Sequence, residues 1–485
     1  MRNSIIDQNR TPLVEAMRDY QKNIKHPFDV PIHKRGNGNR ALEEFMGKEC
    51  TMFDFNSSDS LDNILSPHGA IRQAEELMAD AFGANEALFM VNGTSSAVQA
   101  MIVVSCSPGD KIILPRNVHI SVINAMIIAG VRPVFISSGF DKNLGLSLGI
   151  SIEDLVTTIN ENLDAKAILI NNPTYYGICS DLKKIVDIGH KHNMFVLVDE
   201  AHGTHNYFYE KSPLTAMQAG ADFSAVSMHK TGGALTQSAA LLVGNSMEYS
   251  DVLLKTNLLR TSSASYILMS SLDIARKNLV EKGGTRNQQM LCKANYAREN
   301  LNKIEGLYSW GKELCDGKYV YDVDETKLCI NVKGTGLSGN EIYRKFAYEN
   351  HIQLEVADSY NVLALIGDSD TEEDIDNLIN AFKEIQKYKL SKTCSMNKIY
   401  SIMPTVCMIP RDAFFAQKES IELKKSLNRI SGENIMCYPP GIPVITMGEL
   451  ITKDVIEYIE EAKRNGCLMV GAKDMLLKEI QIVKA

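Results

Sequence analysis

The chain has 485 residues, of which 45% are hydrophobic and 23% are charged, and its formal net charge is −8. These values are typical of soluble globular proteins and favour neither a disordered chain nor a membrane protein. The sequence contains no dense run of Lys and Arg and no apolar stretch of about 18 residues, so we expect neither a nucleic-acid partner nor a membrane partner. Its ten cysteines form no C-x-x-C pair, and the start of the chain lacks a signal-peptide pattern. We expect a cytoplasmic protein that acts on a small molecule.

Short apolar segments alternate with amphipathic segments from about residue 86 to residue 243. Seven of the apolar segments have the length and composition of strands, at residues 87–91, 111–115, 132–137, 165–170, 194–199, 223–227 and 239–243. Between them, residues 119–130, 151–160 and 181–192 carry apolar side chains three to four positions apart, which predicts helices. This alternation predicts an α/β fold with a mostly parallel sheet covered by helices on both faces. Ligands bind such sheets at the carboxyl ends of the strands.

The rest of the chain has a different pattern. Residues from about 248 to 304 are predicted to be wholly helical, and residues from about 318 to 390 are predicted to form a small α+β unit. The segment K-Y-K-L-S-K-T-C-S then precedes a last segment that contains the proline-rich turn Y-P-P-G-I-P. We therefore predict four parts: an N-terminal segment at 1–65, a major domain at 66–310, a small α+β domain at 311–390 and a C-terminal domain at 391–485.

Four short motifs fall at the predicted strand ends or in the turns just after them. They are V-N-G-T-S-S (91–96), R-N-V-H-I-S (116–121), V-D-E-A-H-G (198–203) and S-M-H-K (227–230). Each motif is weak evidence alone, and only their shared position at the strand ends makes them a candidate site.

The first of these motifs predicts a phosphate cradle. Gly93, Thr94 and Ser95 follow a strand and open a helix, where backbone N–H groups and hydroxyls favour an anion. A simple helix cap made by Thr94 or Ser95 would explain the same residues. Asp199 ends the apolar segment M-F-V-L-V, where a carboxylate needs a cationic or hydrogen-bonding partner, although a structural salt bridge would also explain it.

Lys230 follows the next predicted strand, so its side chain and that of Asp199 can face the same crevice. A lysine in such a place is able to form an imine with an aldehyde, whereas most lysines at strand ends are simply exposed. Three neighbouring groups favour the imine-forming role over a simply exposed lysine. They are the phosphate cradle, a carboxylate able to hold a pyridine nitrogen protonated, and the imidazole of His119, which is able to stack on a ring. Together these groups match the needs of pyridoxal 5′-phosphate.

Two other interpretations are weaker. The segment G-L-Y-S-W-G-K-E (306–313) nearly matches a Walker A motif, but Glu313 stands where magnesium needs Ser or Thr, which argues against an ATPase. His202 and His205 lack an evident third ligand at suitable spacing, so we predict no metal site.

The combined motifs resemble the bacterial Orn/Lys/Arg decarboxylase family, which are fold type I pyridoxal phosphate enzymes. The resemblance runs over nearly the whole chain, through D-E-A-H-G, S-x-H-K-T-G-G-x-L-T-Q, R-D-A-F and Y-P-P-G-I-P, and is closest to the short Gram-positive arginine/lysine decarboxylases without a wing domain.

It implies that Lys230 forms the imine, that Asp199 binds the pyridine nitrogen, and that His119 and Ala201 pack on the two faces of the ring. It also implies further cofactor-binding residues, namely Gly93, Thr94, Ser95, His202, Ser227, His229 and, from a neighbouring subunit, Thr261.

The same resemblance implies a homodimer or higher homo-oligomer with shared active sites, acting in polyamine synthesis. The predicted reaction is decarboxylation of a basic amino acid, arginine ahead of lysine, with Lys230 or His229 returning a proton to Cα. Glu449 is predicted to bind the distal basic group of the substrate, the alternative being a surface glutamate. Ile32, Ile120 and Met447 depart from the family pattern near the substrate, which leaves an aminotransferase or a catalytically weak pyridoxal-phosphate-binding protein as alternatives.

Overall fold

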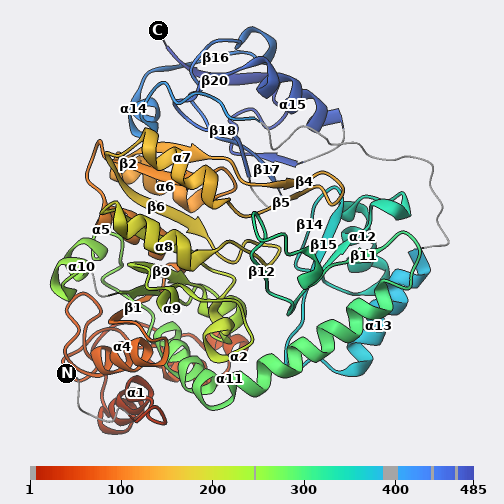
Figure 1. Cartoon of the computed structure of the whole chain (residues 1–485). Helices are drawn as coiled ribbons and strands as arrows, with labels where there is room; N and C mark the ends of the chain where they lie inside the picture. Colours follow the sequence, from red (N-terminus) through yellow and green to blue (C-terminus); the bar gives the residue numbers. More distant parts are fainter. Residues whose placement is uncertain (1–6, 245–246, 386–401, 439–441, 465–467, 485) are drawn as a thin grey trace. The chain divides into compact units, whose positions relative to one another are not determined.

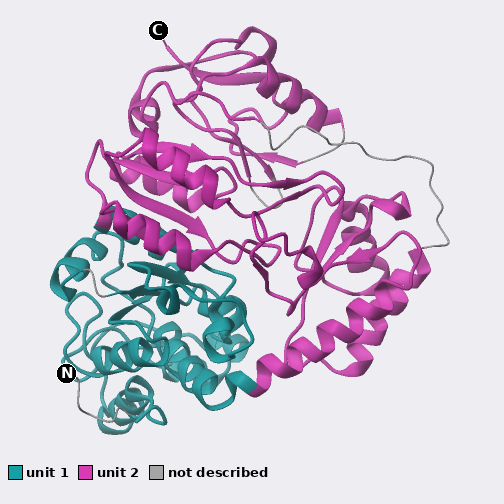
Figure 2. Ribbon diagram, in the orientation of Figure 1, with its two compact units in different colours: residues 1–104, 197–284 teal, residues 105–196, 285–485 magenta. Residues whose placement is uncertain are grey.

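A computed structural model describes residues 7–244, 247–385, 402–438, 442–464 and 468–484. The chain divides into two compact units, coloured separately in Figure 2. Unit 1 comprises Met1–Val104 and Leu197–Gly284, and unit 2 comprises Ser105–Val196 and Thr285–Ala485. Each unit is therefore assembled from two stretches of chain that are distant in sequence. The predicted division at residues 65, 310 and 390 stays a prediction.

The central sheet is mostly parallel and contains the seven predicted strands, which confirms that prediction. Unit 1 holds β1, β10, β9 and most of β8, in that order, and unit 2 the order β6-β2-β3. The bounds are β1 Glu86–Met90, β2 Lys111–Pro115, β3 Arg132–Ile136, β6 Ala165–Asn171, β8 Phe195–Glu200, β9 Phe223–Val226 and β10 Ala239–Val243. β2 is parallel to β3 and β6, and β8 is parallel to β9, whereas β10 is antiparallel to β1 and β9. Because β8 and β9 run in the same direction, the residues that follow them emerge at the same edge of the sheet.

Unit 1 surrounds its strands with helices from both of its chain segments (Figure 1). Their bounds are α1 Pro12–Asn23, α2 Arg40–Met46, α3 Lys48–Met52, α4 Ala70–Ala81, α5 Gly93–Ser105, η1 Thr204–Phe208, α9 Ala216–Ala219, η2 Met228–Gly232, α10 Tyr249–Thr256 and the first part of α11 Tyr266–Leu301. One hydrophobic core joins α1, α4, β1, β10 and α11 through buried side chains such as Leu13, Ile71, Phe89, Leu242 and Met269. The core also includes Val226, the last residue of β9, and Met228 in the turn that follows it.

Unit 2 combines its three central strands with helices α6 Ile120–Ala129, α7 Ile152–Glu161 and α8 Leu182–Lys191. It also holds a smaller antiparallel sheet of order β11-β13-β15-β14, next to α12 Gly339–Lys345, η5 Phe346–Asn350 and α13 Glu372–Ile385. The strands of that sheet are β11 Tyr308–Ser309, β13 Lys327–Asn331, β14 Val356–Ala357 and β15 Asn361–Leu365. Two short pairs complete the region: β4 Phe140–Asp141 with β5 Leu146–Ser147, and β7 Ile178–Cys179 with β12 Asp322–Val323. Strands β13 and β15 and helices α12 and α13 lie within residues 318–390, for which a mixture of strands and helices was predicted.

The C-terminal part of unit 2 has its own buried core. Its elements are α14 Pro410–Phe415, β16 Lys418–Glu422, β17 Ile435–Tyr438, β18 Ile442–Ile445, α15 Lys453–Arg464, β19 Leu468–Val470 and β20 Glu479–Val483. β16 pairs with β20, and the order of the second sheet is β18-β17-β19. The predicted linker K-Y-K-L-S-K-T-C-S and the P-P-G of the proline-rich turn lie outside the described residues.

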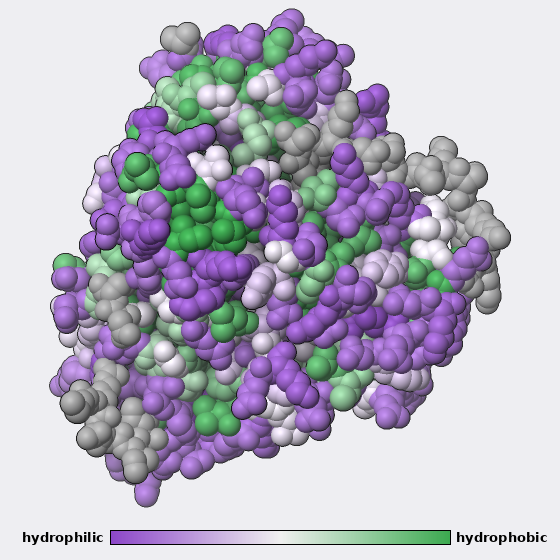
Figure 3. Space-filling view, viewed as in Figure 1, coloured by the Kyte–Doolittle hydropathy of each residue, from purple (hydrophilic) through white to green (hydrophobic). Residues whose placement is uncertain are grey.

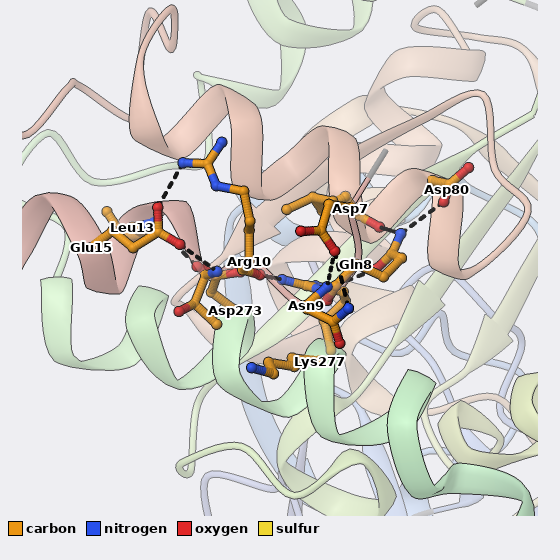
Figure 4. A network of polar contacts seen from close by, with 12 residues as sticks. Asp7, Gln8, Asn9, Arg10, Leu13, Glu15, Asp80, Asp273 and Lys277 are labelled. Atoms are coloured by element: carbon orange, nitrogen blue, oxygen red, sulfur yellow. Dashed lines mark hydrogen bonds and ion pairs between the residues drawn. The ribbon is translucent and has the colours of Figure 1, made fainter. Parts of the chain in front are cut away.

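The N-terminal segment is held on α11 by a buried polar cluster, part of which Figure 4 shows. Arg276 Nη1 donates to Gln8 Oε1 (2.9 Å), Arg276 Nη2 donates to Asp273 Oδ1 (2.8 Å), and Asp273 Oδ2 accepts from the backbone N of Leu13 (3.1 Å). Gln8 Nε2 in turn donates to Asp80 Oδ2 of α4 (2.7 Å). Both members of the Asp273–Arg276 pair are fully buried, so the pair ties residues 7–13 to the body of unit 1.

One helical prediction is wrong. Helix α10 ends at Thr256 and α11 begins at Tyr266, so residues 257–265 interrupt the region predicted to be wholly helical. This interruption contains several Ser and Thr residues, whose side chains compete for backbone hydrogen bonds, as when Ser263 N donates to Thr261 Oγ1 (3.2 Å). Within the described ranges, no helix has both the length and the hydropathy needed to cross a bilayer. The face drawn in Figure 3 is largely hydrophilic, with separate hydrophobic areas between the polar side chains.

Candidate active site

The end of β8 carries two consecutive carboxyl side chains, Asp199 and Glu200. Successive residues of a strand point to opposite faces of a sheet, so the two carboxyls lie on different faces. Asp199 is 8% exposed, and its Oδ1 accepts a hydrogen bond from the backbone N of Ala201 (3.1 Å). That bond holds the carboxylate over the turn that begins at Ala201.

The turn after β9 carries the predicted imine-forming lysine. Residues Met228–Gly232 form a short π-helix, a feature that is often found at functional sites. Lys230 is exposed, its backbone N donates to the carbonyl of Ser227 (3.1 Å), and its Nζ lies 2.8 Å from His202 Nε2. The structure thus brings the lysine after β9 together with the histidine after β8, as expected for the ends of neighbouring parallel strands.

The turn between β1 and α5 fits a phosphate group. Gly93 has a φ of +78°, which favours glycine, and a Cβ atom placed there would meet nothing within 4 Å, so the space beside this helix end is open. The hydroxyls of Thr94 and Ser227 are hydrogen-bonded to each other, and both residues are buried. Two hydroxyls beside the first turn of the 13-residue helix α5 offer an anion the donors that it needs.

The positions of the other predicted cofactor residues do not test their predicted roles. His229 Nδ1 lies 3.0 Å from the carbonyl of Ser238, which fixes the ring toward that residue. Ala201 and Thr261 are half-buried, and Ser95 is exposed. Their roles stay predictions, including the contribution of Thr261 to a neighbouring subunit.

His119 belongs to unit 2. It is the N-cap of α6, where its Nδ1 accepts from the backbone N of Ser121 (3.2 Å) and lies 2.9 Å from Ser121 Oγ. The ring is exposed and held at the start of the helix. Its predicted stacking on the cofactor stays a prediction.

Glu449 is completely buried in unit 2, so it is not a surface glutamate. Its Oε2 accepts from Arg116 Nη2 (2.9 Å) and from the backbone N of Thr446 (2.6 Å), and its Oε1 accepts from Arg116 Nη1. Arg116 also donates to the carbonyl of Val444 (3.0 Å) and lies over the ring of Phe135 (4.7 Å to the centroid). A guanidinium of the protein itself therefore occupies both oxygens of the carboxylate that was predicted to bind the substrate.

Two residues of this arrangement were missed in the sequence. Arg116 follows a buried strand, a position at which a charge needs a partner, but nothing in the sequence indicates a partner 333 positions away. Glu200 could have been found, because the same argument that singled out Asp199 applies to the next residue. It is 1% exposed, and burial raises its pKa to about 7.

Comparisons with known proteins show the family to which the chain belongs. The model of the Orn/Lys/Arg decarboxylase major domain matches residues 11–374, and that of the C-terminal domain matches residues 393–471. An arginine decarboxylase of Bacillus subtilis is 40% identical over 484 residues, 99% of each chain, and one of Halalkalibacterium halodurans is 40% identical over 484 residues, 98% of each chain. Among solved structures, a lysine decarboxylase of Francisella novicida has a TM-score of 0.87 at 20% identity, covering 98% of this chain and 81% of its own. That last likeness concerns the fold.

Proposed function

Because the chain belongs to the Orn/Lys/Arg decarboxylase family, we propose that it removes the α-carboxylate of arginine as carbon dioxide, leaving agmatine for polyamine synthesis. The chain is a pyridoxal-phosphate-dependent amino-acid decarboxylase. Arginine is favoured over lysine because the full-length relatives at 40% identity are named arginine decarboxylases. The observation that carries the assignment of the site is that Asp199 and the turn with Lys230 end neighbouring parallel strands.

The residues present fit the cofactor. The open space at Gly93 and the hydroxyls of Thr94 and Ser227 would bind its phosphate, and the exposed Lys230, beside His202, would hold its aldehyde covalently. Asp199 would hold a proton on the pyridine nitrogen, because a buried carboxylate favours a cationic partner. When bound, pyridoxal phosphate supplies an electron sink for the electron pair that the departing carboxylate leaves behind.

Proton transfer to Cα would then fall to Lys230. Between the two histidines near it, His202 is the one whose ring nitrogen lies 2.8 Å from Lys230 Nζ, whereas His229 Nδ1 is directed to the carbonyl of Ser238. The chain thus supports Lys230 as the proton donor with His202 beside it, and leaves His229 to hold the turn.

We also propose that the active form is a cytoplasmic homodimer. The segment between α1 and α3 exposes large apolar side chains, with Phe28 94%, Ile32 81% and Phe45 86% exposed. Burial of such side chains by a second copy would remove apolar area from water. The expectation that Thr261 reaches the site of the neighbouring subunit agrees with such an assembly.

The distal basic group of the substrate needs an acidic partner. Glu449 as its partner stays a prediction, and a substrate guanidinium would have to compete with Arg116 for it. Ile32, Ile120 and Met447 stay candidates for an altered substrate range, and only reaction products decide their effect.

The test is product analysis by mass spectrometry. The cofactor-loaded protein is incubated separately with arginine, lysine and ornithine, with Lys230→Ala as the inactive variant and Lys282→Ala, an exposed lysine of α11, as the matched control. Agmatine from the wild type and the control but not from Lys230→Ala supports the proposal. Cadaverine or putrescine alone would correct the substrate, an oxo acid would indicate transamination, and full activity of Lys230→Ala would refute the site.

A further inference from the structure

Glu200 is a buried carboxyl group that the proposed reaction does not use. It lies on the face of the sheet opposite to Asp199, and it shares that face with Ser224 of β9, because Ser224 is in register with Val198, two residues before Glu200. Glu200 is the last residue of β8, so its side chain lies next to the turn that leads to the candidate site, but on the other face of the sheet.

Three groups of the described residues donate hydrogen bonds to this carboxyl. Glu200 Oε1 accepts from the backbone N of Ala216 in α9 (2.9 Å), and Oε2 accepts from Ser224 Oγ (2.6 Å) and from Tyr207 Oη of η1. The titratable group on its own face is Tyr207 from η1, while β9 and α9 present a hydroxyl and a backbone N–H; Asp199, on the opposite face, acts on it only through its charge. Three donors match an ionised carboxylate, whereas a protonated carboxyl must turn one oxygen from acceptor to donor.

Two short routes lead from Glu200 to Lys230. In the first, the carbonyl of Glu200 accepts from Gly203 N (2.8 Å), which closes the turn that carries His202, and His202 Nε2 lies 2.8 Å from Lys230 Nζ. The carboxyl of the same residue thus anchors the start of the turn that ends beside the lysine.

The second route passes through η1. Tyr207, bound to the Glu200 carboxyl, packs on Phe82 with ring centroids 4.8 Å apart, which fixes the short helix. At the other end of η1, Thr204 Oγ1 donates to the carbonyl of Ser227 (3.0 Å), and that carbonyl also accepts from Lys230 N (3.1 Å). The position of η1 therefore sets the position of the turn that carries Lys230.

We propose that Glu200 is a positioning residue whose ionised carboxylate holds the His202 turn and η1 against the Lys230 turn, and whose protonation loosens this support. The proposal rests on the proposed function, in which Lys230 reacts with the cofactor aldehyde. Because burial raises the pKa of Glu200 to about 7, the change in support falls within the neutral pH range.

The experiment measures the reactivity of Lys230 in cofactor-free protein. Wild type, Glu200→Gln and Tyr207→Phe are mixed with pyridoxal phosphate between about pH 6 and pH 8.5, reduced with borohydride, and digested for mass spectrometry. Modification of Lys230 is divided by that of the exposed Lys282 in the same molecule, which removes the general effect of pH on amines. The matched control is Glu210→Gln, an exposed glutamate.

We expect the wild-type ratio to rise about tenfold from pH 6 to pH 8, the effect of one hydrogen bond to a charged group. In Glu200→Gln the ratio should stay at the low wild-type value of pH 6 at every pH, because glutamine cannot ionise. In Tyr207→Phe the ratio at pH 8 should be several-fold lower than in the wild type, but it should still rise with pH around the same midpoint. The melting temperature of Glu200→Gln at pH 8 should be at or above that of the wild type. Such a result shows that the low reactivity of Lys230 comes from its changed position and not from a general loss of structure.

Two results would overturn the inference. If Glu200→Gln follows the wild-type ratio at every pH, the carboxylate does not position the lysine, although the proposed function stands. If Lys230 is unmodified in the wild type while Lys282 reacts, the proposed function itself fails, and the inference fails with it.

Discussion

Substitution of Glu449 by glutamine separates a structural role from a substrate-binding role of this carboxyl. The side chain is completely buried and paired through both oxygens with Arg116, whose own side chain is 8% exposed. Removal of one charge from a buried pair typically costs about 3–5 kcal/mol, because the other charge is left in a low-dielectric environment. The amide oxygen of glutamine keeps one acceptor for Arg116, so we expect about 3 kcal/mol, the lower end of that range.

That loss is a large part of the stability of an ordinary protein, about 5–15 kcal/mol in total. The assay is thermal and urea unfolding of Glu449→Gln, in parallel with the KM for arginine. The double variant Arg116→Met with Glu449→Leu is the matched comparison, since an apolar pair of similar volume commonly replaces a buried ion pair without loss. We expect the single variant to be destabilised and the double variant to recover most of the stability.

The two roles give opposite results. If Glu449 only pairs with Arg116, the double variant regains stability and binds arginine with a KM near that of the wild type. If Glu449 binds the substrate, the double variant is stable but its KM for arginine rises by at least tenfold. Such a rise corresponds to the loss of one hydrogen bond to a charged group. An unchanged melting temperature of Glu449→Gln together with a raised KM would refute the structural reasoning.

Three further predictions follow from the buried polar groups. Folding raises the pKa of Glu200 from 4.5 to about 7. The stability that its protonated form contributes is therefore complete below about pH 4.5 and is lost as the pH rises through 7. In urea unfolding, the free energy of unfolding of Glu200→Gln should exceed that of the wild type by an amount that grows between pH 5 and pH 8, by at most roughly 3 kcal/mol. Equal pH dependence of the two proteins would contradict this. Arg276→Met removes the donors that hold the N-terminal segment, so residues 7–24 should become cleavable by trypsin while the rest of the chain resists. Thr94→Val and Ser227→Ala should each weaken binding of pyridoxal phosphate about tenfold in an absorbance titration, and unchanged affinity in both would remove the phosphate from this turn.

Much of the fold could be predicted because its signals are local. The strands of the central sheet are short apolar runs in sequence, and the motifs of the site stand directly after them, so strand direction alone places Asp199 near the turn of Lys230. The boundary of a helix depends on weaker local preferences. The break at residues 257–265 was not predicted, although its Ser and Thr side chains can compete for backbone hydrogen bonds, as Thr261 Oγ1 does for Ser263 N.

The partner of a buried charge is much harder to predict. Arg116 and Glu449 are 333 positions apart, and no periodicity connects the end of β2 to a turn of the C-terminal part. The sequence suggested that Glu449 meets a guanidinium, and in the structure a guanidinium does lie on it, but that of Arg116. A carboxylate chemically suited to a basic substrate is equally suited to an arginine of the protein, and only the fold distinguishes the two.

The end of β8 shows how a site is supported at a cost in stability. Two buried carboxyls in sequence disfavour folding, since each must leave water. Asp199 has a use in the proposed chemistry, whereas Glu200 faces the opposite side of the sheet, and an apolar residue there would bury more favourably. Yet Glu200 joins η1, α9 and β9 through three donors, and an apolar side chain would leave the Ser224 hydroxyl and the Ala216 N–H without that acceptor. If the reactivity of Lys230 falls in Glu200→Gln while the stability above pH 7 rises, the carboxylate serves the position of the lysine and not the stability of the fold.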